Sequence, residues 1–429
     1  MLRKSLWSTA LAITGGLALL MGGPAAWAAS PETSGPVKLL FTIPVPVAPT
    51  NTTGGMYGFD ISFVDQSNQT YYLGDRSNAA VTVVNAKTGT FVKHITATPP
   101  FAGATGNNST SGPNGVATDG VGKCLFAGDG PSRVVSFKIP SGTQVGDVNT
   151  GGMFRADEMA YDPKDKLLLV ANNADTPPFA TLISVGAGCT LTLGKKIVFG
   201  FSTNGAEQAA WDPVTQRFYQ SIPSISGTIA DPGPMGAIAR INPLTATVEI
   251  LFNVPFCMPA GLSLRPTNQT FLAGCSVTYN TTGVPWFGAD TNSANPSQVI
   301  IDTNGAFVFV NGVGSSDEVW YNAGDDHWYT GTSNSPYSAR PVAGTGGATS
   351  TTDQGAAVLG VIDGSSQSLD QLVPTLNVPA VTGKHVSGSS HSVAANATNN
   401  WVFVPHPANN AILGCLTGCI GVYGRDNGD

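Results

Sequence analysis

The sequence has few charged residues and fewer basic than acidic ones. Only 11% of its 429 residues are Asp, Glu, Lys or Arg, and the net charge is −7. Without residues 1–29, which contain two basic and no acidic residues, the net charge becomes −9. This balance argues against a basic groove that binds nucleic acid.

Several catalytic signatures are missing as well. The chain has no Gly-x-Ser-x-Gly elbow, no phosphate loop, no Cys-x-x-Cys-His haem site and no His-Glu-x-x-His zinc helix. Serine hydrolase, nucleotide-binding and cytochrome functions are therefore disfavoured. Beyond the N-terminus, no apolar run reaches the roughly 20 residues that cross a bilayer, so we expect no membrane span after signal removal.

The N-terminus is typical of a secretory signal peptide. It starts with two basic residues, Arg3 and Lys4. An apolar stretch follows over 6–20, and then a run of small residues over 24–29. We predict a signal peptide over 1–29, cleaved after Ala28 or Ala29, and one domain over 30–429. A retained membrane anchor is the alternative, but the apolar stretch is short for one. The expected product is a secreted or periplasmic monomer.

Six cysteines follow the predicted signal peptide, an even number that permits three disulfides among 15 connectivities. Cys257 and Cys275 flank one predicted hairpin and are our first pair. Cys415 and Cys419 form a local pair, although their spacing also leaves a metal site open. Cys124 with Cys189 follows by elimination.

Glycine and proline are abundant, with 52 and 30 residues, which excludes coiled coils and long helices and favours short strands with many turns. One unit recurs seven times: a polar residue, a short apolar strand, an Asp- or Asn-rich turn and a second apolar strand. The copies begin at Asp60, Asn114, Asp157, Glu207, Ala260, Asp317 and His391. Their spacing of 43 to 74 residues suits four-stranded propeller blades with variable loops.

Third and fourth strands follow most copies, for example AVTVVN from Ala80 and TFVKHI from Thr90. The last copy has only a third strand, IGVYG from Ile420, and VKLLFTIPVP from Val37 is left without a partner. We therefore predict an all-β, seven-bladed β-propeller of four-stranded antiparallel blades, closed when the N-terminal strand joins the last blade. Two packed β-sandwiches are the alternative.

The predicted surface insertions are Val277–Ser297, Ser333–Gln354 and Pro374–Ser390.

The segments GDRSNAAVTVVNAKTG from Gly74 and LLVANNAD from Leu168 resemble the YVTN-type propeller repeats of secreted, surface-layer and periplasmic proteins. The resemblance covers most of the first three repeats. It implies the propeller fold, but the family includes lactonases, redox subunits and proteins without known chemistry. The chain lacks the Glu-Gly-Pro opening expected of gluconolactonase-type propellers, which argues against a direct transfer of lactonase activity.

In a propeller, the first strand of each blade lines the central channel, so equivalent repeat positions form a ring. Six of the seven opening residues are polar, and four are acids. Converging carboxylates repel one another unless a cation compensates them. We predict a metal site. Ca²⁺ is the first candidate, and Zn²⁺ and Mn²⁺ are alternatives because His391 belongs to the same ring. Its predicted ligands are Asp60, Asn114, Asp157, Glu207 and Asp317. Acids that accept backbone N–H groups or face a water-filled channel are the alternative.

A second ring is predicted fifteen residues after each opening residue, where the second strand ends on the same face. We expect it to form a ligand-binding rim with Arg76, which is adjacent to Asp75. Its members are Asp75, Asp129, Asn172, Thr332 and His406. Asp162 and Asp212, in the YDP and WDP triplets, are interpreted as caps of their hairpin turns.

The leading functional hypothesis is an exported metal-dependent hydrolase or lyase that acts on a small polar molecule. The metal would polarise a carbonyl or activate water, with Glu207 or Asp317 as general base and His391 as proton donor. The second hypothesis is a non-catalytic propeller that binds a carbohydrate, peptide or cell-wall partner. A subunit of a periplasmic redox complex is a third.

Overall fold

The computed structural model describes residues 35–285, 296–333 and 357–426. These residues belong to one compact unit, Thr33–Asp429, and form five four-stranded sheets, one eight-stranded sheet and one two-stranded sheet. The predicted signal peptide lies outside the described residues, as do parts of two predicted insertions. No helix within the described ranges is both long and apolar enough to cross a membrane.

Each of the first three sheets is an antiparallel meander, as the repeat predicts. The first contains β2 (Ser62–Asp65), β3 (Thr70–Asp75), β4 (Ala80–Asn85) and β5 (Thr90–Ile95). The second contains β6 (Val116–Thr118), β7 (Cys124–Asp129), β8 (Arg133–Lys138) and β9 (Thr143–Asn149). The third contains β10 (Met159–Asp162), β11 (Leu167–Asn172), β12 (Phe179–Val185) and β13 (Leu191–Val198). Two 3₁₀ turns, Asn108–Thr110 and Ala187–Cys189, lie between strands.

The eight-stranded sheet consists of two such meanders, joined by a single parallel pairing of Met235 with Cys257. Its first half contains β14 (Ala209–Asp212), β15 (Arg217–Ile222), β16 (Met235–Asn242) and β17 (Thr247–Pro255). Its second half contains β18 (Cys257–Arg265), β19 (Thr270–Thr278), β20 (Ser297–Asp302) and β21 (Phe307–Asn311).

The next four-stranded sheet contains β22 (Ser316–Asn322), β23 (His327–Thr332), β24 (Val358–Asp363) and β25 (Ser368–Pro374). A short hairpin of β26 (Asn377–Val378) and β27 (Gly388–Ser389) follows it. The remaining sheet contains β28 (Ala394–Asn396), β29 (Trp401–His406), β30 (Cys419–Gly424) and β1 (Lys38–Pro44). In this sheet the N-terminal strand β1 pairs antiparallel with the C-terminal strand β30, the pairing expected of the segment from Val37.

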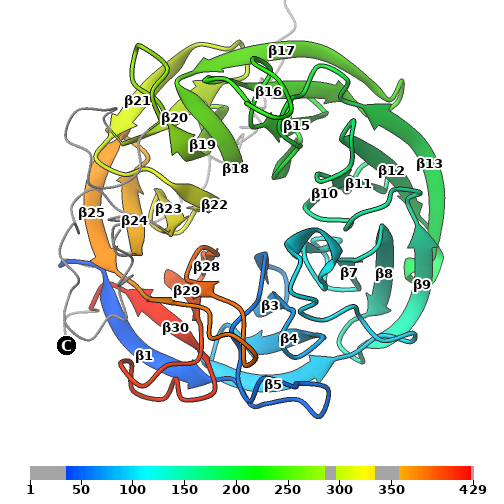
Figure 1. Ribbon diagram of the computed structural model, residues 1–429, viewed down its shortest axis with the longest axis vertical. Helices are drawn as coiled ribbons and strands as arrows, with labels where there is room; N and C mark the ends of the chain where they lie inside the picture. Colours follow the sequence, from blue (N-terminus) through cyan, green and yellow to red (C-terminus); the bar gives the residue numbers. More distant parts are fainter. Residues whose placement is uncertain (1–34, 286–295, 334–356, 427–429) are drawn as a thin grey trace, which may run out of the picture. The chain divides into compact units, whose positions relative to one another are not determined.

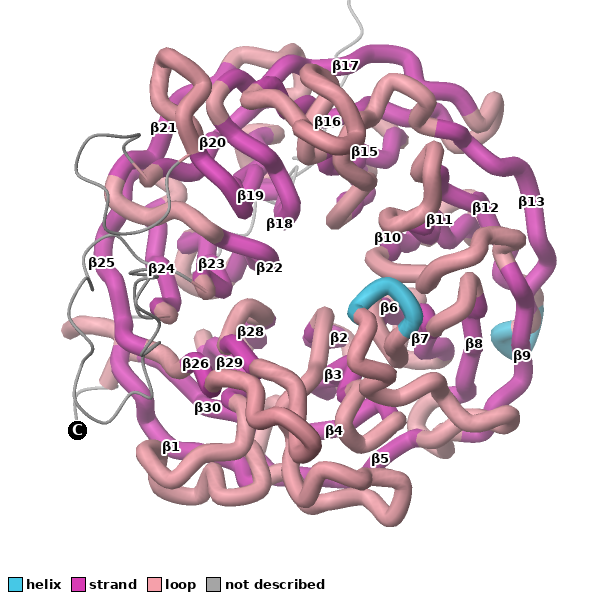
Figure 2. Tube along the Cα trace, in the orientation of Figure 1, coloured by secondary structure: helices cyan, strands magenta, loops and turns pink. Residues whose placement is uncertain are grey.

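The sheets stand around a common centre, with the first strand of each meander innermost and the fourth strand outermost (Figures 1 and 2). Apolar side chains fill the space between neighbouring sheets. The first and last sheets pack against each other through Tyr71 and Phe403, whose ring centroids lie 5.2 Å apart in one buried cluster. Burying each ring contributes roughly 1.5–3 kcal/mol, so residues from both ends of the chain share one core.

The inner hairpins are capped as the triplets predict. The Oδ1 atom of Asp162 accepts the backbone N–H of Lys164 at 2.8 Å, and that of Asp212 accepts the N–H of Val214 at 2.9 Å. Each carboxylate thus satisfies a donor that the tight turn leaves without a strand partner. The hairpins hold the inner strands at equivalent positions in successive sheets.

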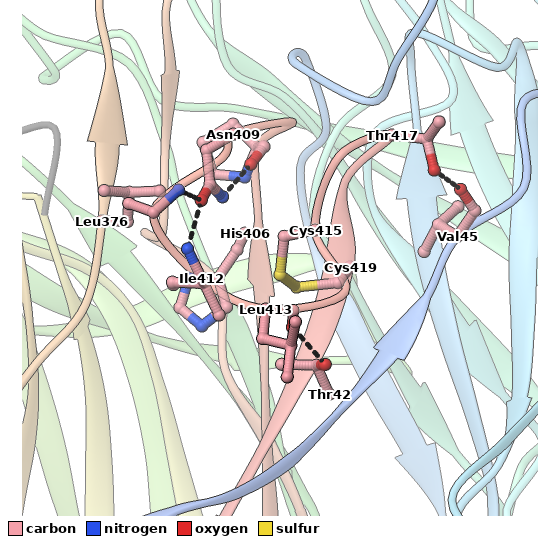
Figure 3. The surroundings of a disulfide bond; sticks show 12 residues. Thr42, Val45, Leu376, His406, Asn409, Ile412, Leu413, Cys415, Thr417 and Cys419 are labelled. Carbon is pink, nitrogen blue, oxygen red and sulfur yellow. Dashed lines mark hydrogen bonds between the residues drawn. A yellow bond between two sulfur atoms is a disulfide. The ribbon is translucent and has the colours of Figure 1, made fainter. Parts of the chain in front are cut away.

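All three expected disulfides are present: Cys124–Cys189, Cys257–Cys275 and Cys415–Cys419. The third lies in the loop between β29 and β30, next to β1 (Figure 3). There, Thr42 Oγ1 donates to the carbonyl of Leu413 at 2.7 Å, and Thr417 Oγ1 donates to the carbonyl of Val45 at 2.8 Å. The disulfide and these hydrogen bonds hold the loop against the N-terminal strand, so the metal alternative for this cysteine pair is not realised.

We expect the Cys124–Cys189 disulfide to stabilise the fold more than Cys415–Cys419, because its sequence separation is 65 residues rather than 4. The chain-entropy relation gives about 4 kcal/mol for the long loop and about 2 kcal/mol for the short one. Urea unfolding of the two double Cys→Ser variants measures the difference. Non-reducing peptide mapping of the wild type is the control, and equal losses in both variants would contradict the expectation.

Candidate functional site

Three opening residues of the repeats occupy equivalent backbone positions. The N–H of Asp60 donates to the carbonyl of Gly74 at 2.8 Å, and that of Asp157 donates to Ala171 at 2.8 Å. Glu207 donates to Ser221 in the same way, at 2.9 Å. Because the same hydrogen bond fixes these three residues to the second strand of their sheets, they lie at the same level, just before their inner strands.

Glycines let neighbouring sheets approach one another closely. A Cβ atom on Gly115 would overlap the carbonyl oxygen of Asp157 in the next sheet, and one on Gly331 would overlap the carbonyl oxygen of His391. Any other residue would push the neighbouring backbone away. These contacts bring opening residues of neighbouring repeats together around one cavity.

The cavity has a volume of about 640 Å³ and receives side chains from distant parts of the chain. It lies at the level where the inner strands begin, and the hairpin of β26 and β27 forms part of its wall. The ionisable side chains that line it are Asp60, Arg76, Arg155, Asp157, Glu158, Glu207, Asp317 and His391. Four predicted ring acids and the predicted proton donor therefore meet in one place.

Arg76 occupies the position beside Asp60 and Asn114. Its Nη2 forms an ion pair with Asp60 Oδ2, and its Nε donates to Asn114 Oδ1 at 2.8 Å. Asn108 accepts a further hydrogen bond from Nη1. Burial alone would raise the pKa of Asp60, but Arg76, His391 and Arg155 together outweigh it and hold the pKa below its ordinary value. Asn114, predicted as a metal ligand, instead orients this arginine.

Arg155 pairs with the second buried aspartate. Its Nη2 lies 2.7 Å from Asp157 Oδ2, and both side chains are less than a tenth exposed. Burial raises the pKa of Asp157 to about 6, although the guanidinium favours the ionised form. Burial opposes the charge on Arg155, but Asp157 and Asp60 outweigh it and raise the arginine pKa.

His391 lies between Phe59 and Asp60. Its ring stacks on Phe59 with centroids 5.4 Å apart, and its Nδ1 lies 2.9 Å from the carbonyl oxygen of Ser389. Its Nε2 faces Asp60 Oδ1 at 3.7 Å. Burial opposes protonation, but the contact with Asp60 and the charge of Asp317 outweigh it and raise the histidine pKa. The pair therefore favours a protonated imidazole.

Within the described ranges, Glu207 and Asp317 form no ion pair with a basic side chain. Burial first, and then the charge of Asp157, raise the pKa of Glu207 to about 8, and the amide of Asn173 lies 3.4 Å from its carboxylate. Burial also raises the pKa of Asp317, against the opposing charge of His391. At neutral pH, Glu207 holds a proton while Asp60 is ionised, so acids in one cavity differ in protonation.

Two further glutamates were not predicted. Glu158 and Glu318 directly follow ring acids, are 3% and 1% exposed, and burial raises both pKa values well above the ordinary range. Glu158 lines the cavity, whereas Ser392 Oγ donates to Glu318 Oε2 at 2.8 Å. Regular strand alternation would have turned them away from the centre. Glu158 precedes β10, and a register irregularity in β22 spans Glu318, so alternation does not apply to either.

The predicted second ring is corrected by the structure, because Asp75 and Asp129 do not line the cavity. Asp75 accepts hydrogen bonds from the Asn78 amide and from Thr82 Oγ1, at 2.6 and 2.9 Å. Asp129 accepts the N–H of Ala102 at 3.0 Å and pairs with the adjacent arginine, Arg133. Both carboxylates hold loops and strands within their own sheets, and only Arg76 of this predicted group reaches the cavity.

Asn172 and His406 are also buried away from the cavity lining. The Oδ1 atom of Asn172 accepts from Thr150 Oγ1 at 2.7 Å. His406, expected in a loop at the rim, ends β29 and lies within hydrogen-bond distance of Ser390 Oγ and Tyr423 OH, at 2.8 and 2.9 Å. Burial lowers its pKa to about 3. Both residues are occupied by internal hydrogen bonds.

The expected metal has no ligand set among the described residues, where no group of three or more His, Cys, Asp or Glu could hold an ion. The oxygens of Asp60 and Asp157 instead face Arg76 and Arg155. Arginines therefore supply positive charge to two of the ring acids. The metal hypothesis stays a prediction.

Comparison with known proteins identifies the fold but no family. No protein-family model and no curated protein matches the chain. A chain of Kuenenia stuttgartiensis hydrazine synthase superposes with a TM-score of 0.61 and 12% identity, over 90% of this chain and 99% of that one. A chain of the mitotic checkpoint complex gives a TM-score of 0.55 and 12% identity, over 96% and 98%. The chain folds as a β-propeller.

The similarity to these two structures shows the fold alone, because the sequence identity is only 12%. The expectation of an all-β propeller built from four-stranded antiparallel sheets is confirmed at this level. Membership in the YVTN-type family stays a prediction. The feature of the propeller that bears on its function is the cavity.

The buried pair predicts a strong response to the loss of Arg155. Arg155→Met leaves the carboxylate of Asp157 buried without its cation, which costs about 3–5 kcal/mol. Adding Asp157→Asn removes the unpaired charge, so the double variant should recover at least half of this loss. Urea unfolding at pH 7 measures all three proteins. A double variant less stable than Arg155→Met would contradict the pairing.

Glu207 predicts a pH-dependent stability. Its pKa is about 8 in the folded protein and about 4.3 in an unfolded chain. Between these values the folded state holds more protons, so wild-type stability falls as pH rises. Glu207→Gln removes this loss and should gain about 2 kcal/mol relative to wild type between pH 5 and pH 8, after allowance for solvent screening.

Urea unfolding at pH 5, 6.5 and 8 measures this gain. Glu249→Gln is the matched control, because pairing with Arg217 lowers the pKa of Glu249 to about 2, below the tested range. Its stability difference from wild type should not change with pH. A Glu207→Gln difference that is equally constant would contradict the raised pKa.

Proposed function

We propose that the chain is an exported enzyme that hydrolyses or eliminates a group from a small polar molecule by acid–base catalysis in the propeller cavity. The observation that carries the proposal is the meeting of His391, Asp60 and Glu207 with two arginines around one cavity. Neighbouring groups with opposite protonation preferences are the arrangement that acid–base catalysis needs.

We further propose seven blades with a closed ring. The two halves of the eight-stranded sheet share one residue pairing, and counting them separately adds two blades to the five four-stranded sheets. The pairing of β1 with β30 and the shared core of the first and last sheets support closure. Closure would leave no open face on the terminal blades.

Export is part of the proposal. The predicted signal peptide over 1–29 and three disulfides among the described cysteines support an oxidising compartment outside the cytosol. The YVTN-type resemblance, which is to secreted and periplasmic proteins, agrees with this location. A monomer fits the proposal, since every group it uses belongs to one chain.

In the proposed mechanism, His391 is the proton donor. Its Nδ1 faces the carbonyl of Ser389, which leaves Nε2 to exchange a proton, while Asp60 favours the protonated ring. Glu207 is the general base: its pKa of about 8 leaves an ionised fraction near neutral pH, which takes a proton from water or substrate while His391 gives one to the leaving group. Arg76 and Arg155 line the same cavity and stabilise negative charge that develops on the substrate.

Asp317 is the alternative base. It lines the same cavity and lies close enough to His391 and Asp60 for their charges to affect its pKa. Its side chain is shorter than that of Glu207. Asp317 lies in β22, whereas Glu207 lies in the segment before β14. Separate substitutions of the two acids distinguish their roles.

Non-catalytic binding of a carbohydrate or peptide is the second candidate. The segment between β25 and β28 favours it, because polar groups of Asn377, Ser387 and Ser389 line the cavity wall. Tyr57, also in the lining, stacks on His385 with ring centroids 3.6 Å apart. Such a wall of hydroxyl, amide and aromatic groups suits a sugar or a peptide without requiring a reaction.

The test of catalysis is a screen of small esters, lactones, amides, glycosides and hydroxy acids, with products followed by mass spectrometry. Any turnover should fall about 100-fold or more in His391→Gln and in Glu207→Gln, because each removes a proton-transfer group. Glu249→Gln should keep full activity. Turnover that survives both cavity substitutions would contradict the mechanism.

Metal analysis separates this mechanism from the metal hypothesis. Protein purified without chelators is analysed by mass spectrometry next to Asp157→Ala and Glu207→Ala. We expect turnover to survive EDTA. Stoichiometric metal that is lost in both variants would support the metal site instead, and saturable ligand binding without turnover would favour the second candidate.

A further inference from the structure

The cavity holds more acids than the protein's own cations balance. Its acids are Asp60, Asp157, Glu158, Glu207 and Asp317, with Glu318 buried beside them. Arg76 and Arg155 pair with Asp60 and Asp157, and His391 also faces Asp60. Among the described residues, no ion pair involves the other four acids, so they are the unbalanced part of the site.

An unpartnered oxygen points to a ligand on this side. Glu158 lines the cavity, is 3% exposed, and its Oε2 has no hydrogen-bond partner within the described residues. Asp157 Oδ1 also has no hydrogen-bond partner within the described residues, although Asp157 Oδ2 faces Arg155. Buried polar oxygens are normally hydrogen-bonded, and a donor brought by a ligand would satisfy these two.

The spread of the acids suits an organic cation better than a metal ion. A calcium ion needs six to eight oxygens at about 2.3–2.6 Å, and the described residues contain no group of three or more metal-holding side chains. A cavity of about 640 Å³ has the volume of a small-molecule site. The aromatic ring of Tyr57 also lines the cavity, and aromatic rings attract cations.

We propose that the cavity binds a small molecule with a primary or secondary ammonium group, and that Glu207, Asp317 and Glu158 are its counter-ions. The inference rests on the proposed function, because it names the class of molecule that the same cavity takes. The ammonium group donates hydrogen bonds to these acids, and its positive charge favours their ionised form. It thus takes the place of the cation that these acids lack among the described residues. The arginine side of the cavity is left for the rest of the molecule.

The test compares ligands of equal length that differ in charge. The probes are 1-aminobutane, 1,4-diaminobutane, 1-butanol, butyrate and calcium chloride, titrated into the wild-type protein in a calorimeter at pH 7.5. We expect both amines to bind at least tenfold more tightly than 1-butanol, as a charge-assisted hydrogen bond predicts. Amines that bind no better than 1-butanol, or calcium binding alone, would overturn the inference.

Variants locate the ammonium group. Glu207→Gln and Asp317→Asn should each weaken amine binding about tenfold and leave 1-butanol binding unchanged. Glu249→Gln is the matched control for the loss of a carboxylate outside the cavity, and thermal unfolding verifies that each variant is folded. Amine affinity that is unchanged in both cavity variants overturns the inference.

The two proposals fail separately. Turnover of a neutral compound that depends on His391, together with no amine binding, keeps the proposed function and rejects the ammonium inference. Amine binding that depends on Glu207, without turnover of any amine or neutral compound, supports the inference and favours binding over catalysis.

Discussion

The site depends on two ion pairs that are almost fully removed from water, Arg76 with Asp60 and Arg155 with Asp157. A buried carboxylate without a partner takes up a proton or destabilises the fold. The arginines favour the ionised forms of Asp60 and Asp157, while burial raises the pKa of Glu207 to about 8. The cavity therefore contains acids with different protonation preferences side by side.

The scaffold makes this charge arrangement possible by repetition. The same backbone hydrogen bond anchors Asp60, Asp157 and Glu207 to the second strand of their sheets, and glycines such as Gly115 and Gly331 let neighbouring sheets approach one another closely. The packing of the first sheet on the last then brings Asp60 next to His391, which lies 331 positions later in the sequence numbering. The acids thus come from separate sheets, and each sheet carries only one or two of them. A rigid frame of this kind can change its chemistry by exchanging single residues at equivalent positions.

The fold by itself leaves the activity open, because its likeness to solved propellers is only 12% in sequence. The features that bear on function lie in the cavity: its volume, its two arginines, its histidine and its surplus of acids. The proposed acid–base chemistry and the proposed ammonium recognition draw on the same physical fact, that burial separates the protonation states of groups that lie close together. The two proposals share Glu207 and Asp317. Proton donation is assigned to His391, whereas Glu158 belongs to the ammonium proposal alone.

The repeated strands and turns and the level of Asp60, Asp157 and Glu207 follow from short-range patterns, because strand alternation and turn chemistry act over a few residues. The sequence also indicated the pairing of the N-terminal strand and the Cys124–Cys189 disulfide, because each was left without another partner. The balance of the acids depends on the tertiary structure. Arg155 lies in a loop, two residues before a ring acid, and no repeat position marks it. Glu158 and Glu318 lie where strand alternation does not hold. The residues of the predicted second ring are held instead by hydrogen bonds to buried groups near them; they are Asp75, Asp129, Asn172, Thr332 and His406. Pairing between charges from different sheets depends on distances in space, which a sequence pattern does not contain.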